Sequence, residues 1–174
     1  RIYGTTAGYP GFFLAGASNN VVRYNTILQT GAASQGFYDD ESQQGLPATG
    51  NVVTDNIFAV TGAGSWALKS ETTSLDVVDN NLYYAPNGYC GYIQGANKTT
   101  VADMQAAWAA APYADTELER NDLNSPTQAD PQFVSVDSGD ADFLSIALGS
   151  PARGASSIPY ADLGAGQRRE LHRL

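Results

Sequence analysis

The chain has 174 residues, of which 43% are hydrophobic and 16% are charged, and it contains 18 glycines. This length and composition indicate one loop-rich globular domain with a real core and exclude a disordered chain. Acidic residues outnumber Lys and Arg by 18 to 9, which gives a net charge of −9. Nucleic-acid binding needs a basic face, so we expect no nucleic-acid partner.

Cysteine and histidine are too scarce for several common kinds of site. Cys90 is the single cysteine and His172 the single histidine. An internal disulfide and a Cys/His zinc site are therefore excluded, and a Ser-His-Asp mechanism would depend on the last few residues. No apolar run approaches the roughly 20 residues that span a bilayer, so we expect no membrane span.

The clearest pattern is a segment that occurs three times. "NNVVRYNTI" begins at Asn19, "NVVTDNIF" at Asn51 and "DVVDNNLY" at Asp76. Their alignment superposes an asparagine, a valine three residues before it and an apolar residue two residues after it. The asparagines are Asn25, Asn56 and Asn81, the valines are Val22, Val53 and Val78, and the apolar residues are Ile27, Phe58 and Tyr83. It also pairs "QTGAASQGFY" with "VTGAGSWALK", and so Gly31 with Gly62 and Ser34 with Ser65. The asparagines are 31 and 25 residues apart, an interval typical of a repeat architecture.

The repeat indicates a coil of short parallel strands. Each unit has β-branched runs separated by Gly, Asn and Ser, and no amphipathic helix, which excludes helical solenoids and doubly wound sheets. We expect the three asparagines to form one column at a bend, because asparagine tolerates left-handed backbone and its amides can bond up a stack. The three valines should form an inward column.

In chain order, we expect coils at about 1–30, 31–60, 61–85 and 86–98. A helix follows over 100–111, with Val101, Met104 and Trp108 on the face that packs against the open end of the coils. A loop over 115–128 leads to two short strands within 130–146 and an irregular end. The chain thus divides into coils at 1–98 and a helix with a capping segment at 99–174.

These residues resemble a known group of proteins. "GFFLAGASNNVVRYN" from Gly11 and "GFYDDESQQG" from Gly36 look like successive coils of bacterial right-handed parallel β-helix repeat proteins of the pectate-lyase-like superfamily. "TTVADMQAAWA" is similar to the helix that leaves the last coil, and "GDADFLSIALGSPARGA" to the segment that closes the fold. The resemblance implies an all-β fold, a single-stranded right-handed parallel β-helix. It says little about activity, since this fold hosts lyases, hydrolases, epimerases, adhesins and phage spikes.

The richest candidate site is the stretch "GFYDDESQQG". Strand alternation places Tyr38 and Asp40 outward and Asp39 inward or at the bend, with Glu41 following. The next coil offers Lys69 at the level of Asp39 and Glu71 at the level of Glu41.

Two chemistries suit these residues. Asp40 with Glu41 or Glu71 would form the carboxyl pair of a glycosidase, because neighbouring coils place carboxyl groups about 4.8 Å apart. Alternatively, Lys69 would be the base of a uronic-acid lyase, with Asp39, Asp40 and Glu41 holding Ca²⁺ through hard oxygen ligands. The plain alternative is that these charges are solvated or cap turns.

Other residues are candidates for substrate binding. Arg23 and Tyr24 lie on a repeat strand and are either surface ladder residues or, with Tyr38, contacts to a substrate. Aromatic faces suit pyranose C–H surfaces, so a sugar-stacking strip is an alternative to fold filling for five aromatic residues, namely Tyr9, Phe13, Tyr38, Tyr89 and Tyr92.

We therefore expect a secreted or cell-surface protein that engages a polysaccharide, as the C-terminal part of a lyase- or hydrolase-like protein. A non-catalytic scaffold, as in adhesins or spikes, is the alternative. The helix and the strands after it would cover the last coil, whereas "RIYGTTAGYPGFF" is already patterned like a coil. We expect further coils of the parent chain, or another subunit, at that first edge, since open strand edges promote association.

Overall fold

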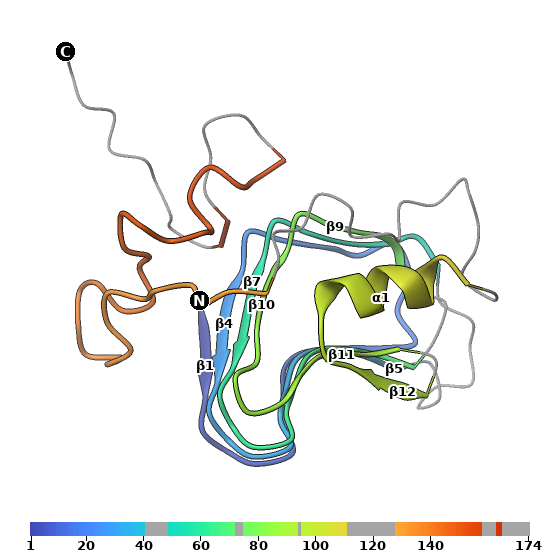
Figure 1. The fold of residues 1–174 in the computed structure, drawn as a ribbon, viewed down its shortest axis with the longest axis horizontal. Coiled ribbons are helices and arrows are strands. Elements are labelled where there is room, and N and C mark those ends of the chain that lie inside the picture. The colour runs from blue at the N-terminus through green and yellow to red at the C-terminus, as the bar shows by residue number, and fades with distance from the viewer. Residues whose placement is uncertain (41–48, 72–74, 94, 111–127, 158–162, 165–174) are drawn as a thin grey trace.

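The computed structural model describes residues 1–40, 49–71, 75–93, 95–110, 128–157 and 163–164. Its strands form three sheets that surround a common core, and within each sheet parallel strands stack one above another (Figure 1). Sheet A contains β1 (Ile2–Gly4), β4 (Thr26–Gln29), β7 (Ile57–Val60) and β10 (Leu82–Tyr84). Sheet B contains β2 (Pro10–Ala15), β5 (Gln35–Asp40), β8 (Trp66–Ser70) and β11 (Tyr89–Ile93), with β12 (Ala96–Lys98) antiparallel to β11. Sheet C contains β3 (Val21–Arg23), β6 (Asn51–Thr54) and β9 (Leu75–Asp79).

The chain visits sheets A, B and C in turn and then returns to sheet A. We call one such pass a coil, and each of its strands pairs in parallel with the corresponding strand of the next coil. The expectation of an all-β chain with stacked parallel strands is confirmed.

The three repeated asparagines form the expected column where sheet C bends into sheet A. Asn56 Oδ1 accepts hydrogen bonds from the backbone N and the Nδ2 of Asn25, at 2.9 and 3.1 Å. Asn81 Oδ1 accepts from the same two atoms of Asn56, at 3.1 and 3.0 Å. Each amide thus satisfies the backbone of the coil before it, so the column both closes the bend and fixes the stacking register.

The left-handed residue at this bend is the one before each asparagine. Tyr24, Asp55 and Asn80 have φ values of 58°, 59° and 54°, whereas we expected the asparagines themselves to take this conformation. The preceding residue turns the chain from sheet C toward sheet A, and the asparagine side chain then bonds back to the backbone of the bend. Its Nδ2 bonds the carbonyl two residues earlier, as in Asn56 to Thr54 at 2.8 Å.

At a second bend, from sheet A into sheet B, glycine and serine residues of successive coils lie above one another. Gly31 and Gly62 do align, and an added Cβ on Gly62 would lie 1.9 Å from the Gly31 carbonyl oxygen. Ser65 Oγ donates to the Gly31 carbonyl and accepts from the Ser34 backbone N, both at 3.1 Å. Only glycine allows the bends of neighbouring coils to approach this closely. The serine hydroxyl forms hydrogen bonds with the backbone groups that are buried where the bends meet.

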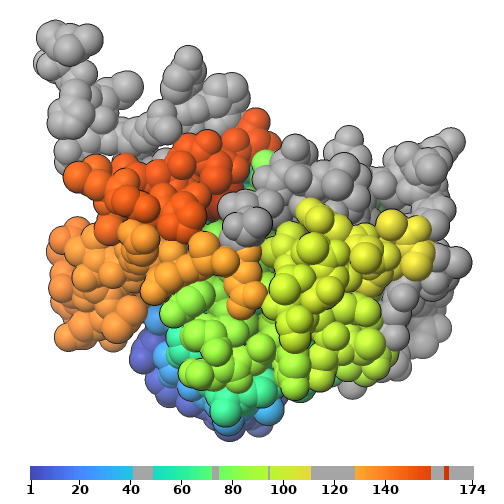
Figure 2. Space-filling view, viewed as in Figure 1, coloured from blue at the N-terminus to red at the C-terminus, as the bar shows by residue number. Residues whose placement is uncertain are grey.

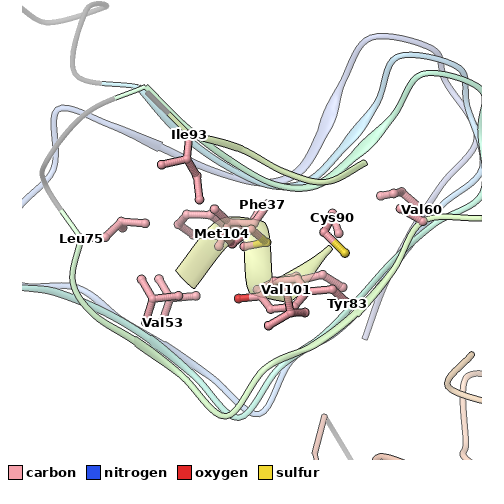
Figure 3. Close-up of a cluster of buried hydrophobic side chains, with 14 of the residues drawn as sticks. Phe37, Val53, Val60, Leu75, Tyr83, Cys90, Ile93, Val101 and Met104 are labelled. Atoms are coloured by element: carbon pink, nitrogen blue, oxygen red, sulfur yellow. The ribbon is translucent and has the colours of Figure 1, made fainter. Parts of the chain in front are cut away.

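Inside the coils, equivalent positions form apolar columns (Figure 3). The three repeated valines align in register and are buried, as expected. Phe58 and Tyr83, at equivalent positions of sheet A, stack with ring centroids 6.0 Å apart, and Phe37 of sheet B lies 6.0 Å from Phe58 across the core. Each coil therefore buries its inward side chains against the coils on either side of it.

Helix α1 (Val101–Trp108) covers the end of the last coil (Figure 1). It begins after Thr100, whose hydroxyl accepts from the Asp103 backbone N in a capping box. Val101, Met104 and Trp108 are buried in the core, as their spacing predicts. The helix is shorter than the expected 100–111 and packs closely on Gly91, where an added Cβ would lie 3.0 Å from Met104 Sδ.

Residues 128–157 lie against the outer face of sheet A instead of covering the coil end (Figures 1 and 2). Within this closing segment, Phe133 and Leu144 pack on Leu28 and Ala59. The two strands expected at 130–146 are only single bridges, Phe133 to Ile146 and Ser135 to Phe143. Sheet A is thus buried on both faces, which explains why β4 and β7 are buried at every position.

The strands of the first coil, β1, β2 and β3, are the edge strands of their sheets. In the described part of the chain, no strand pairs with their outer edges. Residues 1–10 belong to the first coil itself: they form β1 and the turn that enters β2.

Asn56→Ala should lower the free energy of unfolding by about 1–3 kcal/mol, because it leaves buried donors and acceptors above and below without partners. Asn25→Ala is the matched control. Asn25 is the first rung and is only partly buried, so its loss should cost less. Chemical denaturation measures both. Equal losses, or no loss for Asn56→Ala, would contradict the role of the column.

Candidate functional site

Four side chains form a continuous strip on the outer face of sheet B. In register across neighbouring strands, Phe13 lies beside Tyr38, Tyr38 beside Lys69 and Lys69 beside Tyr92. We call this row of four the sheet B strip. All four are at least partly exposed, and Phe13 and Tyr38 stack with ring centroids 5.1 Å apart. The strip therefore crosses all four coils with one side chain from each.

Lys69 lies among aromatic rings at the centre of this strip. Its Nζ is 4.4 Å from the ring centroid of Tyr38, 5.4 Å from that of Tyr92 and 5.6 Å from that of Trp66. Trp66 also stacks on Tyr89 at 6.2 Å. These contacts hold the ammonium group and the rings together, because ring faces attract cations.

Two carboxylates meet at the edge of the strip. Glu71 Oε1 lies 3.1 Å from Lys69 Nζ, and Glu71 Oε2 accepts from the Tyr38 hydroxyl at 2.6 Å. Asp40 Oδ2 lies 3.1 Å from the same hydroxyl. The two carboxylate oxygens are therefore at most 5.7 Å apart, the sum of their distances to the hydroxyl.

The environment of Tyr38 keeps its hydroxyl protonated. Burial raises the pKa of Tyr38 well above its ordinary value, and the hydrogen bond and negative charge of Glu71, followed by those of Asp40, raise it further. The hydroxyl thus remains a hydrogen-bond donor, and it lies between the two carboxylates. Asp40 itself is only 2% exposed, so a ligand would meet Glu71, which is 34% exposed in its side chain, before Asp40.

The expected position of Lys69 is wrong by one residue. Lys69 pairs with Tyr38, and Ser70 is the residue that pairs with Asp39. Because strand side chains alternate, this single step places Lys69 outward, beside the rings, and Ser70 inward. Glu71 follows the Asp39–Ser70 pair and donates its backbone N to the Asp39 carbonyl at 3.3 Å.

The structure describes two of the three proposed Ca²⁺ ligands, Asp39 and Asp40. Asp39 is buried on the inner side of β5 beside Leu14 and Ser70, and its Oδ2 accepts from Ser70 Oγ at 3.4 Å. Asp40 points to the outer side, toward Tyr38. Glu41 lies outside the described residues. In the part of the chain that the structure describes, no three His, Cys, Asp or Glu side chains gather as a metal site would require.

Arg23 and Tyr24 are not part of this site. They lie on β3 of sheet C and at the bend after it. Arg23 Nη2 is 3.1 Å from Asp55 Oδ2, and the Arg23 guanidinium lies 5.0 Å from the Tyr24 ring centroid. Of the sequence candidates, the structure therefore brings together Tyr38, Asp40, Lys69 and Glu71, and places Arg23 and Tyr24 elsewhere.

Asp55 is a buried acid that the sequence analysis did not single out. Its carboxylate accepts from the backbone N and Oγ of Ser157, at 2.6 and 2.8 Å, and from Ser156 Oγ at 2.9 Å. Burial raises the pKa of Asp55, but these hydrogen bonds and that of Arg23 outweigh burial and leave the pKa below its ordinary value. Asp55 thus fastens the closing segment to the coils.

Trp66 was missed as well, although a signal for it exists. The alignment that pairs Ser34 with Ser65 also pairs Gln35 with Trp66, and the structure has this pairing. Following that column to Tyr89 would have placed Trp66 beside the strip.

In comparisons with known proteins, no family model, curated protein or solved structure matches the chain. In the described residues, no helix has the length and apolar character that crossing a bilayer requires. The function is therefore argued from the geometry of the sites.

Asp55→Asn should lower the free energy of unfolding at neutral pH by about 1–3 kcal/mol. The neutral amide can accept hydrogen bonds from fewer of the donors around this buried position. A carboxyl group whose pKa is lowered by folding stabilises the protein above its unfolded pKa, and this stabilisation is lost as the pH falls through the folded value. The deficit of the variant should therefore shrink below about pH 4. Chemical denaturation at a series of pH values measures the difference in free energy of unfolding between the two proteins. A difference that does not change with pH would show that the charge is unimportant.

Proposed function

We propose that the coils form a single-stranded right-handed parallel β-helix of the pectate-lyase-like type, and that the sheet B strip binds a polysaccharide. The cyclic visit to three sheets and the asparagine column support the first part of the proposal. The unbroken strip across all four coils supports the second.

The single observation that carries the binding proposal is the spacing of the strip. Its side chains repeat at the distance between neighbouring strands, about 4.8 Å, which is comparable to one sugar unit of an extended glycan. Phe13 and Tyr92, at the two ends of the strip, offer ring surfaces for pyranose C–H groups. Tyr38 offers its ring edge, because Phe13 and Lys69 lie against its ring from either side. Lys69 and Glu71 offer a charged donor and acceptor for hydroxyl groups. A glycan chain would thus meet one contact on each coil.

Cleavage of the bound glycan is the finer part of the proposal. The separation of Asp40 and Glu71 is compatible with the roughly 5–5.5 Å of a retaining carboxyl pair. However, the Tyr38 hydroxyl occupies the space between their oxygens, so a sugar bond would have to displace it. Lys69 as a lyase base would first have to leave Glu71. We therefore rank binding ahead of cleavage.

A polysaccharide partner implies a secreted or cell-surface protein, and the edges of β1, β2 and β3 suit pairing with further coils or another subunit. The alternative is a non-catalytic β-helical scaffold. One observation favours it: Lys69, Glu71, Tyr38 and Asp40 bond one another, as a purely structural ladder would.

Tyr38→Ala and Tyr92→Ala should each weaken polysaccharide binding about tenfold, since each removes one aromatic contact of the strip. Tyr24→Ala, which removes an aromatic ring at the bend after β3, is the matched control and should leave binding unchanged. Affinity electrophoresis in gels with neutral or acidic polysaccharides measures the effect. Binding to none of them would favour the scaffold.

Cleavage is tested separately, by assays for unsaturated products and reducing ends. If Lys69 and the acidic candidates are catalytic, Asp40→Asn, Glu71→Gln and Lys69→Ala, with Glu41→Gln, should abolish product formation. Activity that persists when all four substitutions are combined would remove these residues from the reaction.

A further inference from the structure

A second candidate site lies on the outer face of sheet A, between that sheet and the closing segment. A pocket of about 350 Å³ opens there, lined by residues of β1, β4 and β10 on one side and by residues 130–136 on the other. This volume is within the range of about 300–1,000 Å³ that is usual for small-molecule sites. The pocket exists because the closing segment bridges the sheet without filling it.

Aromatic rings line this pocket from both sides. Tyr3 and Tyr84 belong to one outward row of sheet A, with Leu28 and Ala59 between them. The two tyrosines are three strand spacings apart, or about 14 Å, and both line the pocket. Phe133 faces them from the closing segment, and Phe143 holds the Tyr3 ring in an edge contact at 5.8 Å.

Polar groups are distributed over the same walls. Asp130 Oδ1 accepts from the Gln132 backbone N at 2.7 Å, and its carboxylate also takes the hydrogen bond of the Tyr84 hydroxyl. Gln132 holds a left-handed φ of 52°, a costly conformation for a residue with a side chain, of the kind that gathers at ligand sites. Thr30 and Thr61 add hydroxyl groups on the sheet side.

The charge of the walls selects the chemistry of the ligand. Among the described lining residues, Asp130 is the one charged side chain, and it is acidic. An anionic ligand would therefore be repelled. A quaternary ammonium would use the rings but not the threonine and glutamine groups, which can both donate and accept hydrogen bonds. A ring with apolar faces and hydroxyl edges would use all of these groups.

We infer that this pocket binds a short neutral saccharide, at a site separate from the sheet B strip. The rings of Tyr3, Tyr84 and Phe133 contact its C–H faces, and Asp130 and Gln132 bond its hydroxyl groups. The inference stands on the contacts of this pocket alone, so it does not depend on polysaccharide binding at the strip.

Saturation-transfer NMR and calorimetry with glucose, galactose, mannose, maltose and cellobiose test the site directly, with glucuronate and choline as the charged probes. We expect at least one neutral sugar to bind and both charged probes to fail. Asp130→Asn and Phe133→Ala should each lower the affinity for the sugar about tenfold. Val134→Ala is the matched control, because Val134 is 56% exposed and does not line the pocket.

Phe133 is partly buried against the coils, so its variant needs a folding check by circular dichroism. If it does not fold, Asp130→Asn carries the test, because Asp130 is exposed. Binding of choline or glucuronate in place of sugars, or of none of the probes, would overturn the inference. Sugar binding that survives the pocket variants but is lost in Tyr38→Ala would also overturn it, since the ligand would then lie on the strip.

Discussion

The structure depends on the requirement that each strand pairs its backbone with the same strand of the next coil. Ile57 N donates to the Asn25 carbonyl at 2.8 Å, and Leu82 N to the Asn56 carbonyl at 2.9 Å. Once these bonds are formed, residues 31 or 25 positions apart must occupy equivalent places. Columns of like side chains then follow in the core, at the bends and on the outer faces, because every position stacks on its own counterpart.

This constraint connects the fold to both candidate sites. Inward positions supply the apolar columns and must be buried, so chemistry is left to outward positions and loops. On sheet B the outward column is open to solvent and holds three rings and Lys69. On sheet A the outward column is covered by the closing segment, which Asp55 anchors. The same repeat thus produces an open strip on one sheet and a pocket on another.

Much of the fold could be predicted from the sequence, because its signal is local and repeated. The aligned valines and asparagines identified the core and one bend, and the spacing of Val101, Met104 and Trp108 identified the helix face. The position of Lys69 was missed because one residue of register decides which face a side chain takes. The contacts of Asp55 with Ser157 span 102 residues, and the pocket depends on a segment without regular strands. Nothing periodic in the sequence marks such contacts.

The most direct test of this account is NMR detection of scalar couplings across backbone hydrogen bonds in the labelled protein. We expect couplings from Ile57 N to the Asn25 carbonyl, from Leu82 N to the Asn56 carbonyl and from Trp66 N to the Ser34 carbonyl, since these are the bonds that set the register of sheets A and B. Couplings that join these strands in another register, or in antiparallel pairs, would contradict the stacking on which the core, the strip and the pocket all depend.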